Sequence, residues 1–86
     1  MVNAIFRLPQ VKASSGLARS TVYLRVSQGL FTRPIQLGGR SVGWPANEID
    51  ALNSARISGL TDDEIRSLVR RLESQRKSSW KRFGNE

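Results

Sequence analysis

The sequence of 86 residues contains neither cysteine nor histidine. Without cysteine there is no disulfide framework and no thiolate metal site, and without histidine the commonest metal ligand and general base is missing. We therefore expect no metal, no cofactor and no catalytic residues, and hence a protein that is not an enzyme. A magnesium-dependent nuclease would need clustered carboxylates, and the cluster Asp62-Asp63-Glu64 is already explained by helix capping and the helix dipole.

Long hydrophobic runs are also missing. No apolar stretch approaches the roughly 18 residues of a transmembrane helix, and residues 1–7 lack a charged region followed by an apolar one. We therefore expect a soluble protein that does not bind membranes and is not secreted by this route. The composition, 38% hydrophobic and 24% charged, is ordinary for a small folded domain, and the length suits a single core.

Acidic residues are scarce and unevenly distributed. The chain carries 14 Lys and Arg against 7 Asp and Glu, a net charge of +7. Residues 1–45 contain no carboxylate at all, but they contain the basic residues Arg7, Lys12, Arg19, Arg25, Arg33 and Arg40. Solubility does not explain this pattern, because acidic residues serve solubility better than basic ones. The pattern favours nucleic acid as the partner over an acidic protein or a membrane surface.

Two short helices are predicted in the first third of the chain. Leu8 to Ser14 has Pro9 near its start, where a missing N–H costs little. After a turn at Gly16-Leu17, a second helix runs from Arg19 to Gln28 with Val22 and Val26 on one face. Two short helices joined by a tight turn, the second one basic, are typical of a DNA-reading helix-turn-helix.

A β-hairpin is predicted next. Apolar residues alternate on both sides of Gly38-Gly39, and a type I′ turn needs positive φ at both central positions. The alternating residues are Ile35, Leu37, Val42 and Trp44. We expect all four to cover the helices and the turn to point outward, with Arg40 beside it. A helix-turn-helix followed by such a hairpin is a winged helix.

Two more helices complete the prediction. Pro45 and Asn47 open a third helix through about Ser58, in which Ile49 and Leu52, with Ile57, form the inward stripe. Thr61 to Glu64 has the pattern of a capping box that starts a fourth, amphipathic helix. In this helix Ile65, Leu68, Val69 and Leu72 form the apolar stripe, and the other faces are covered by Arg66, Arg70, Arg71, Glu73 and Arg76.

We therefore divide the chain into a winged helix-turn-helix domain (1–58), a C-terminal amphipathic helix (59–78) and a basic, flexible tail (79–86). The expected fold class is mainly α with a small β-hairpin.

The sequence resembles the AlpA family of small phage and prophage regulators, which are related to MerR-type and excisionase winged-helix domains. The resemblance spans residues 5–58 and is carried by these residues: Phe6-Arg7-Leu8, Gly16-Leu17, Arg19 to Tyr23, Gly29, Phe31, Pro34, Leu37 to Trp44 and Glu48-Ile49. The chain departs from the family's pattern at Ala18, Leu24, Thr32 and Leu52, where Ser or Thr, a basic residue, Pro and Trp are frequent.

The resemblance implies a MerR-like or excisionase-like winged helix that binds double-stranded DNA in the bacterial cytoplasm, in association with the nucleoid. Two functions stay open. One is a transcriptional regulator of phage or prophage genes that contacts or excludes RNA polymerase. The other is a recombination directionality factor that bends DNA and contacts an integrase.

Alternatives from other classes are a protein-binding adaptor that uses the amphipathic helix after residue 61, and an RNA binder. The RNA binder is disfavoured because the chain lacks exposed aromatic clusters on strands. Sedimentation and DNA titration at varied salt distinguish the adaptor from a DNA-binding protein.

Candidates for base contacts follow from the second helix. With Val22 and Val26 directed inward, the residues on the opposite side of the helical wheel, Ser20, Thr21, Leu24 and Gln28, face away from the core. A glutamine can bond adenine, a leucine can meet a thymine methyl and an arginine can reach guanine. The base-edge candidates are Arg19, Ser20, Thr21, Leu24 and Gln28. The alternative for this face is an ordinary solvated helix surface.

Other residues are candidates for contacts with the DNA backbone or for contacts that the wing makes with DNA. They are Lys12, Tyr23, Arg25, Arg33 and Arg40. For Tyr23 a half-buried core position is the equal alternative. Because such a helix reads only about four or five base pairs, we expect several copies to associate cooperatively on repeated half-sites.

Overall fold

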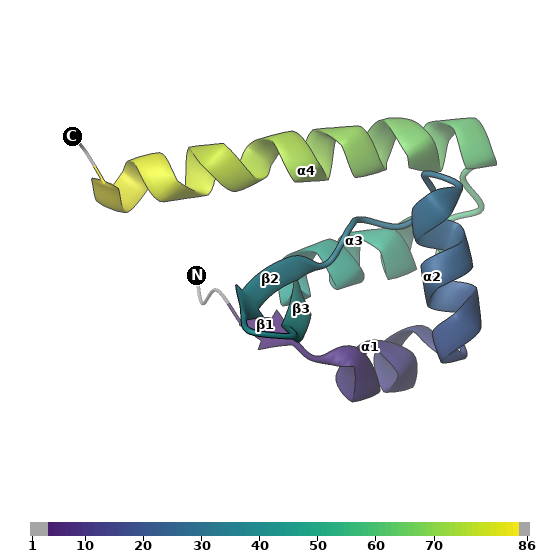
Figure 1. The fold of residues 1–86 in the computed structure, drawn as a ribbon. Coiled ribbons are helices and arrows are strands. Elements are labelled where there is room, and N and C mark those ends of the chain that lie inside the picture. The colour runs from purple at the N-terminus through teal and green to yellow at the C-terminus, as the bar shows by residue number, and fades with distance from the viewer. Residues whose placement is uncertain (1–3, 85–86) are drawn as a thin grey trace.

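The computed structural model describes residues 4–84, with side chains described up to residue 78. The elements follow one another as β1 (Ile5–Phe6), α1 (Leu8–Ser15), α2 (Arg19–Ser27), β2 (Ile35–Gly38), β3 (Ser41–Pro45), α3 (Ala46–Ile57) and α4 (Asp62–Gly84). Helix α4 runs along one side of the molecule, α1 lies on the opposite side and α2 extends between them (Figure 1). This arrangement is the predicted mainly α, winged-helix-like fold with an added C-terminal helix.

The helix-turn-helix has the predicted elements. Helix α1 carries Pro in its first turn and ends at Gly16, and α2 ends at Ser27 with Gln28 as its C-cap. Val11 and Val22 are fully buried, which fixes the inner faces of the two helices. The N-cap of α2 is Ala18, whose methyl group offers no side-chain acceptor.

The wing belongs to a three-stranded antiparallel sheet in the order β1-β3-β2. The predicted hairpin is β2 and β3. Strand β1, whose two residues pair with Pro45 and Trp44, was not predicted. At the hairpin turn Gly38 has φ 117° and Gly39 has φ 54°. These are the positive φ values that the Gly-Gly pair was expected to supply, although Gly38 is the last residue of β2 and Arg40 is itself in the turn.

The orientation predicted for β2 is wrong. Ile35 pairs with Gly43, and Gln36 pairs with Val42. Directly paired residues lie on the same face of a sheet, so Ile35 lies on the face opposite to the one that carries Val42 and Trp44. A register shift between Gln36 and Gly38 disrupts the alternation, and Leu37 is 39% exposed. Only Val42 and Trp44 of the four predicted residues therefore cover the helices.

Gly43 lies in the central strand where three elements approach closely. A Cβ at this position would lie 2.7 Å from Cγ2 of Ile5, 3.0 Å from Cδ1 of Leu37 and 3.0 Å from the carbonyl oxygen of Phe6. The glycine is therefore needed because a side chain has no room there.

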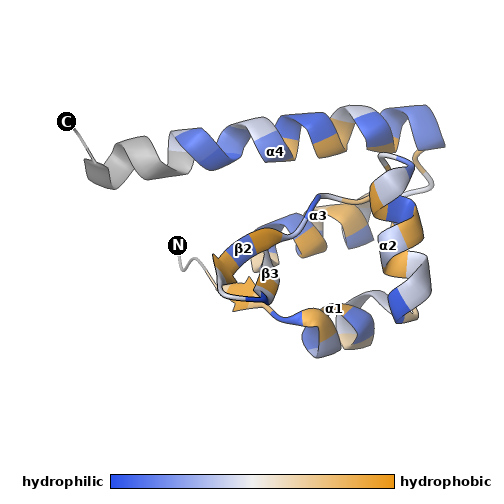
Figure 2. Cartoon of the chain, in the orientation of Figure 1, coloured by the Kyte–Doolittle hydropathy of each residue, from blue (hydrophilic) through white to orange (hydrophobic). Residues whose placement is uncertain are grey.

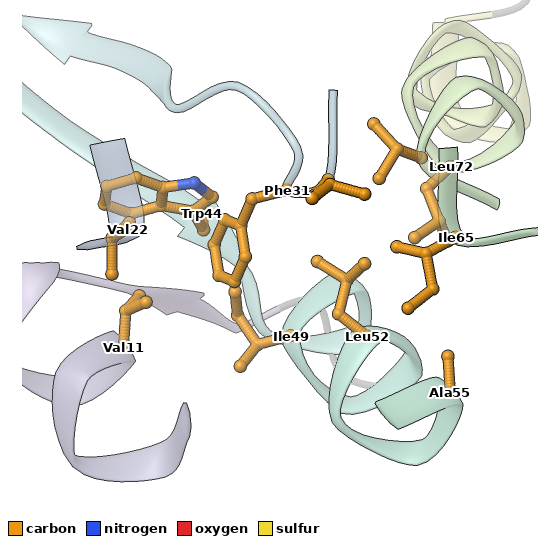
Figure 3. Close-up of a cluster of buried hydrophobic side chains, with 11 residues drawn as sticks. Val11, Val22, Phe31, Trp44, Ile49, Leu52, Ala55, Ile65 and Leu72 are labelled. Atoms are coloured by element: carbon orange, nitrogen blue, oxygen red, sulfur yellow. The ribbon is translucent and has the colours of Figure 1, made fainter. Parts of the chain in front are cut away.

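The core is continuous from the helix-turn-helix to α4. Val11, Val22 and Trp44 lie at one end, Ile65 and Leu72 of α4 lie at the other, and a middle layer that includes Phe31 joins them (Figure 3). Trp44 is fully buried, and its indole Nε1 donates to the carbonyl oxygen of Thr32 at 2.8 Å. Helix α4 is therefore part of the same core as the winged helix.

One residue predicted for the inner face of α3 lies outside. Ile57 is 86% exposed, because two residues after the buried Ala55 it lies on the other side of the helix. Ala55 is buried in its place, together with Ile49 and Leu52.

Helix α4 begins with the predicted capping box. The backbone N–H of Glu64 donates to Thr61 Oγ1 at 3.2 Å, and the backbone N–H of Thr61 donates to Glu64 Oε1 at 2.8 Å. The hydrophobic residues of this helix lie on its inner side, toward α3 (Figure 2). The helix continues to Gly84, beyond the boundary expected at residue 78, and the side chains of the predicted basic tail lie outside the described ones.

Of the five charged residues of α4 predicted on its solvent faces, Arg66, Glu73 and Arg76 instead bond to the rest of the protein. The carboxylate of Glu73 bonds to Arg33, and the guanidinium of Arg76 bonds to Glu48. Glu48 is 2% exposed, so these residues contribute to the packing of α4 on the winged helix. No helix between residues 4 and 84 is both long and apolar enough to cross a membrane.

Candidate nucleic-acid interface

Helix α2 has one buried face and one exposed face. Val22 is fully buried and Val26 packs against the core. Four of the five predicted base-edge residues are exposed and the fifth, Thr21, is half-buried; the exposed ones are Arg19, Ser20, Leu24 and Gln28. Leu24 is 54% exposed, so its methyl groups are accessible from solvent. Ser20, Leu24 and Gln28 lie outward as predicted, whereas Thr21 is half-buried. Contact of these residues with DNA stays a prediction.

Tyr23 joins the exposed start of α2 to the core. Its ring packs edge-on against Trp44, with the ring centroids 6.1 Å apart. The guanidinium carbon of Arg19 lies 5.7 Å from the Tyr23 ring centroid. A cation over an aromatic ring is attracted by the ring quadrupole, so Tyr23 holds the side chain of Arg19 near the helix start. Tyr23 itself is half-buried, as the alternative for this residue anticipated.

Arg25 lies away from the exposed face of α2. It lines an open pocket of about 240 Å³ between α2, the end of α1 and α3, and Ser14, Asn53 and Arg56 also line this pocket. Asn53 Nδ2 donates to the carbonyl oxygen of Ser14 at 3.1 Å, which fixes the wall between α1 and α3. The structure therefore places Arg25 at this pocket and away from the exposed base-edge candidates.

The remaining backbone candidates lie on three different elements. Lys12 is exposed on α1, Arg40 is exposed in the turn between β2 and β3, and Arg33 is exposed in the segment between α2 and β2. Arg33 Nη2 lies 3.4 Å from Glu73 Oε1, and the Arg33 side chain is 75% exposed. An ion pair this exposed contributes little stability, so the guanidinium of Arg33 can still meet a phosphate.

Arg7 is the one member of the basic set in residues 1–45 that was not a contact candidate. Its Nε donates to the carbonyl oxygen of Val42 at 3.0 Å. This bond ties the start of α1 to the hairpin, so Arg7 has a local structural role.

Sequence reasoning missed Arg66 as a partner of α2. Arg66 Nε donates to the carbonyl oxygen of Gln28 at 2.9 Å, at the C-terminal end of α2. A cation is favourable at this end of a helix. No local signal in the sequence indicates this contact, because 38 residues separate the two partners.

The electrostatic character of the site is cationic. Within residues 4–84 no group of three or more Asp, Glu, His or Cys side chains is placed to hold a metal ion. Residues 1–45 contain no Asp or Glu. Their side chains therefore offer positive charge and hydrogen bonds without a carboxylate that would repel phosphate. A helix face of small polar groups, an exposed leucine and surrounding arginines can meet both the edges of bases and the phosphates of a duplex.

Comparison with known proteins gives a family match over the same part of the chain. A family model described as "Prophage CP4-57 regulatory protein (AlpA)" matches residues 4–57. An uncharacterized protein, ORF88, of Enterobacteria phage P4 is 40% identical over 53 residues, which is 62% of this chain and 60% of that protein. No solved structure matches the chain. The matched region contains β1 to α3 and ends before α4 begins.

Proposed function

The chain belongs to the AlpA family of prophage regulatory proteins, and on that premise we propose that it is a sequence-specific double-stranded DNA-binding protein that regulates phage or prophage genes. In this proposal α2 is the recognition helix in the major groove. The turn between β2 and β3 is a wing that places Arg40 on the neighbouring minor groove or backbone, where arginine is favoured by the negative potential.

The observation that carries the proposal is the two-sided character of α2. A fully buried valine, Val22, anchors the helix, and Ser20, Leu24 and Gln28 lie on its exposed side. Residues spaced by four on a helix lie above one another, so these three form a single row along α2. A row of side chains on one rigid helix can read successive base pairs in the major groove.

Each residue of the row has a chemical partner on DNA. The amide of Gln28 can make two hydrogen bonds with adenine, the methyl groups of Leu24 can contact the methyl of thymine, and Ser20 can bond to several bases. Arg19, held over Tyr23 at the start of α2, reaches guanine or a phosphate. Lys12, Arg25 and Arg33 supply phosphate contacts that fix the register.

The proposal is tested by selecting binding sites from a randomised duplex pool. Changing Ser20, Leu24 or Gln28 to Ala is expected to change the selected base pairs while the thermal midpoint stays close to that of the wild type. Ser67, exposed on α4, is the matched control, and Ser67→Ala should leave the selected sequence unchanged. Identical selected sequences for the wild type and the α2 variants would contradict the assignment of α2 as the reading helix.

The same selection reports how many copies bind. Because one such helix reads about four or five base pairs, we infer that several copies bind repeated half-sites cooperatively. We therefore expect the selected sequences to contain repeats at a fixed spacing and the binding curve to be sigmoidal.

A second function uses the same surface. A recombination directionality factor also places a recognition helix and a wing on DNA, and it bends the duplex and contacts an integrase. Circular-permutation gel shifts on the selected site separate the two functions. A strong bend favours the directionality factor, and a straight duplex favours a regulator that contacts or excludes RNA polymerase.

A further inference from the structure

The backbone of Arg33 is held by two side chains of α4. The N–H of Arg33 donates to Glu73 Oε2 at 2.8 Å, and the carbonyl oxygen of Arg33 accepts from Arg76 Nη2 at 2.7 Å. Arg33 lies in the segment 28–34 that joins the end of α2 to the start of β2. Both polar backbone atoms of Arg33, near the end of this connector, are therefore bonded to charged groups on another element, and bonds to charged groups are the stronger kind.

Arg76 is itself fixed. Its Nε donates to Glu48 Oε2 at 2.8 Å and its Nη2 donates to Glu48 Oε1 at 2.7 Å. The planar guanidinium matches a carboxylate in this two-bond geometry and has little freedom to rotate within it. Because Glu48 is buried in α3, the donor that reaches Arg33 is held in place by the core of the winged helix.

A third contact holds the other end of the connector. Arg66 Nε donates to the carbonyl oxygen of Gln28 at 2.9 Å. The aliphatic part of the same side chain lies beside Gly29, where a Cβ would be 3.7 Å from Arg66 Cγ. Helix α4 therefore contacts the connector at the point where α2 ends and again near the point where β2 begins.

We propose that α4, which lies outside the family match, is a positioning element that sets where the recognition helix stands relative to the wing. Arg66, Glu73 and Arg76 are then positioning residues for DNA recognition that act through the connector 28–34. This inference rests on the proposed function, because it assumes that α2 and the wing meet one duplex at the same time.

The physical reason is the cost of ordering two binding elements. A helix and a wing joined by a loose connector would lose conformational freedom when both dock on DNA, and that loss reduces affinity. Contacts that fix the connector in advance remove much of this loss for the correct site. Binding to random DNA is dominated by charge and needs no particular geometry, so it gains little from the contacts of α4.

Glu73→Ala gives a test in which the two kinds of binding move in opposite directions. The change removes a negative charge, so affinity for random DNA is expected to rise. It also frees the N–H of Arg33, so affinity for the selected site is expected to fall. We expect the ratio of specific to random affinity to drop by about 2- to 30-fold, the range for residues that act on a site through others.

Two further variants separate positioning from charge and from stability. Asp50, exposed on α3, is the matched control, since Asp50→Ala makes the same charge change away from the connector and should leave the ratio unchanged. Glu73→Gln keeps an acceptor for the N–H of Arg33 and should restore most of the ratio. All affinities are measured at a temperature where melting curves show each variant to be folded.

The hydrogen bond from the Arg33 N–H to Glu73 can also be tested without DNA. Hydrogen exchange of the Arg33 amide, measured by NMR, should be faster in Glu73→Ala and close to the wild type in Glu73→Gln. An Arg33 amide that exchanges equally fast in all three proteins overturns the inference.

The DNA measurements distinguish two kinds of failure. A wild-type protein that selects no sequence contradicts the proposed function and removes the basis of this inference. A wild-type protein that selects a sequence, with equal ratios for Glu73→Ala and Asp50→Ala, overturns the inference alone.

Discussion

Glu48 and Arg76 form a two-bond ion pair between α3 and α4, with oxygen–nitrogen distances of 2.7 and 2.8 Å. The carboxylate is almost wholly buried, and the Arg76 side chain is 24% exposed. The hydrogen bonds to Glu48 raise the pKa of the Arg76 guanidinium, against the opposing effect of its burial. A raised pKa for a cation stabilises the fold at every pH below its ordinary value, so this contribution is lost only in strong alkali.

Breaking this pair from one side is expected to be costly. Arg76→Met leaves the buried carboxylate of Glu48 without a partner, and such losses amount to about 3–5 kcal/mol. Replacing both residues, as in Glu48→Leu with Arg76→Met, should recover most of the lost stability because no charge is left buried. Urea denaturation measures both free energies of unfolding. Arg56→Ala, which breaks an exposed pair with Asp62, is the control and should cost less than about 1 kcal/mol.

Arg40 is expected to matter for DNA affinity and not for stability. It is exposed in the turn between β2 and β3, so Arg40→Ala should leave the thermal midpoint unchanged. Loss of a groove or phosphate contact should weaken DNA binding by about 1–3 kcal/mol. Fluorescence anisotropy with a labelled duplex measures the change, and Arg70→Ala on the exposed side of α4 serves as the charge-matched control. Equal effects of the two substitutions would argue against a wing contact.

Affinity for DNA is expected to fall steeply with salt. About five phosphate contacts from the basic residues of the first 45 positions imply a slope of log affinity against log salt near −4 to −5. Titrations at several potassium chloride concentrations give the slope directly. A slope shallower than about −2 would mean that most of these basic residues lie away from the duplex.

Two threonines should respond in opposite ways to the same chemical change. Thr32 is fully buried, and its Oγ1 has no hydrogen-bond partner among the described residues. Thr32→Val removes an unpaired hydroxyl and is expected to stabilise the protein by about 1 kcal/mol. Thr61→Val removes the cap that receives the N–H of Glu64 and should destabilise by about 1 kcal/mol. Each kcal/mol corresponds to a shift of about 4–8 °C in the thermal midpoint, and two midpoints that move the same way would refute this prediction.

Gly43 is expected to tolerate no side chain. In Gly43→Ala the new methyl would meet Ile5 and the carbonyl oxygen of Phe6, and overpacking of this kind costs about 1–3 kcal/mol. Ser41→Ala, two residues earlier on β3, is the control and should change stability by less than about 0.5 kcal/mol. Adding Ile5→Ala to Gly43→Ala should restore only part of the loss, because the backbone oxygen of Phe6 remains.

The elements that sequence patterns predicted are those with local signals. The hairpin follows from Gly38-Gly39, and the start of α4 follows from the spacing of Thr61 and Glu64. The outward face of α2 follows from two valines four residues apart. In each case the residues that decide the structure lie within a few positions of one another.

What sequence patterns missed depends on contacts between distant segments. Strand β1 has only two residues, too few to show an alternation. The irregularity at Leu37 turned part of β2 to the other face, and no composition signal marks it. Arg76 lies four residues after Leu72, at the next position of the apolar stripe, but a charged residue there is read as solvated unless its partner is known. That partner, Glu48, is 28 residues away.

Strand β1 also sets an order of assembly. The hairpin of β2 and β3 closes a short loop, whereas Ile5 pairs with Pro45, across roughly 40 residues whose closure carries a larger entropic cost. We expect β1 to pair last during folding and to detach first. Its departure turns β3 from a central strand into an edge strand with unpaired backbone groups, the kind of edge that recruits other chains into aggregates. The rate of aggregation at high concentration should therefore follow the opening of this short N-terminal strand and not the global unfolding of the domain.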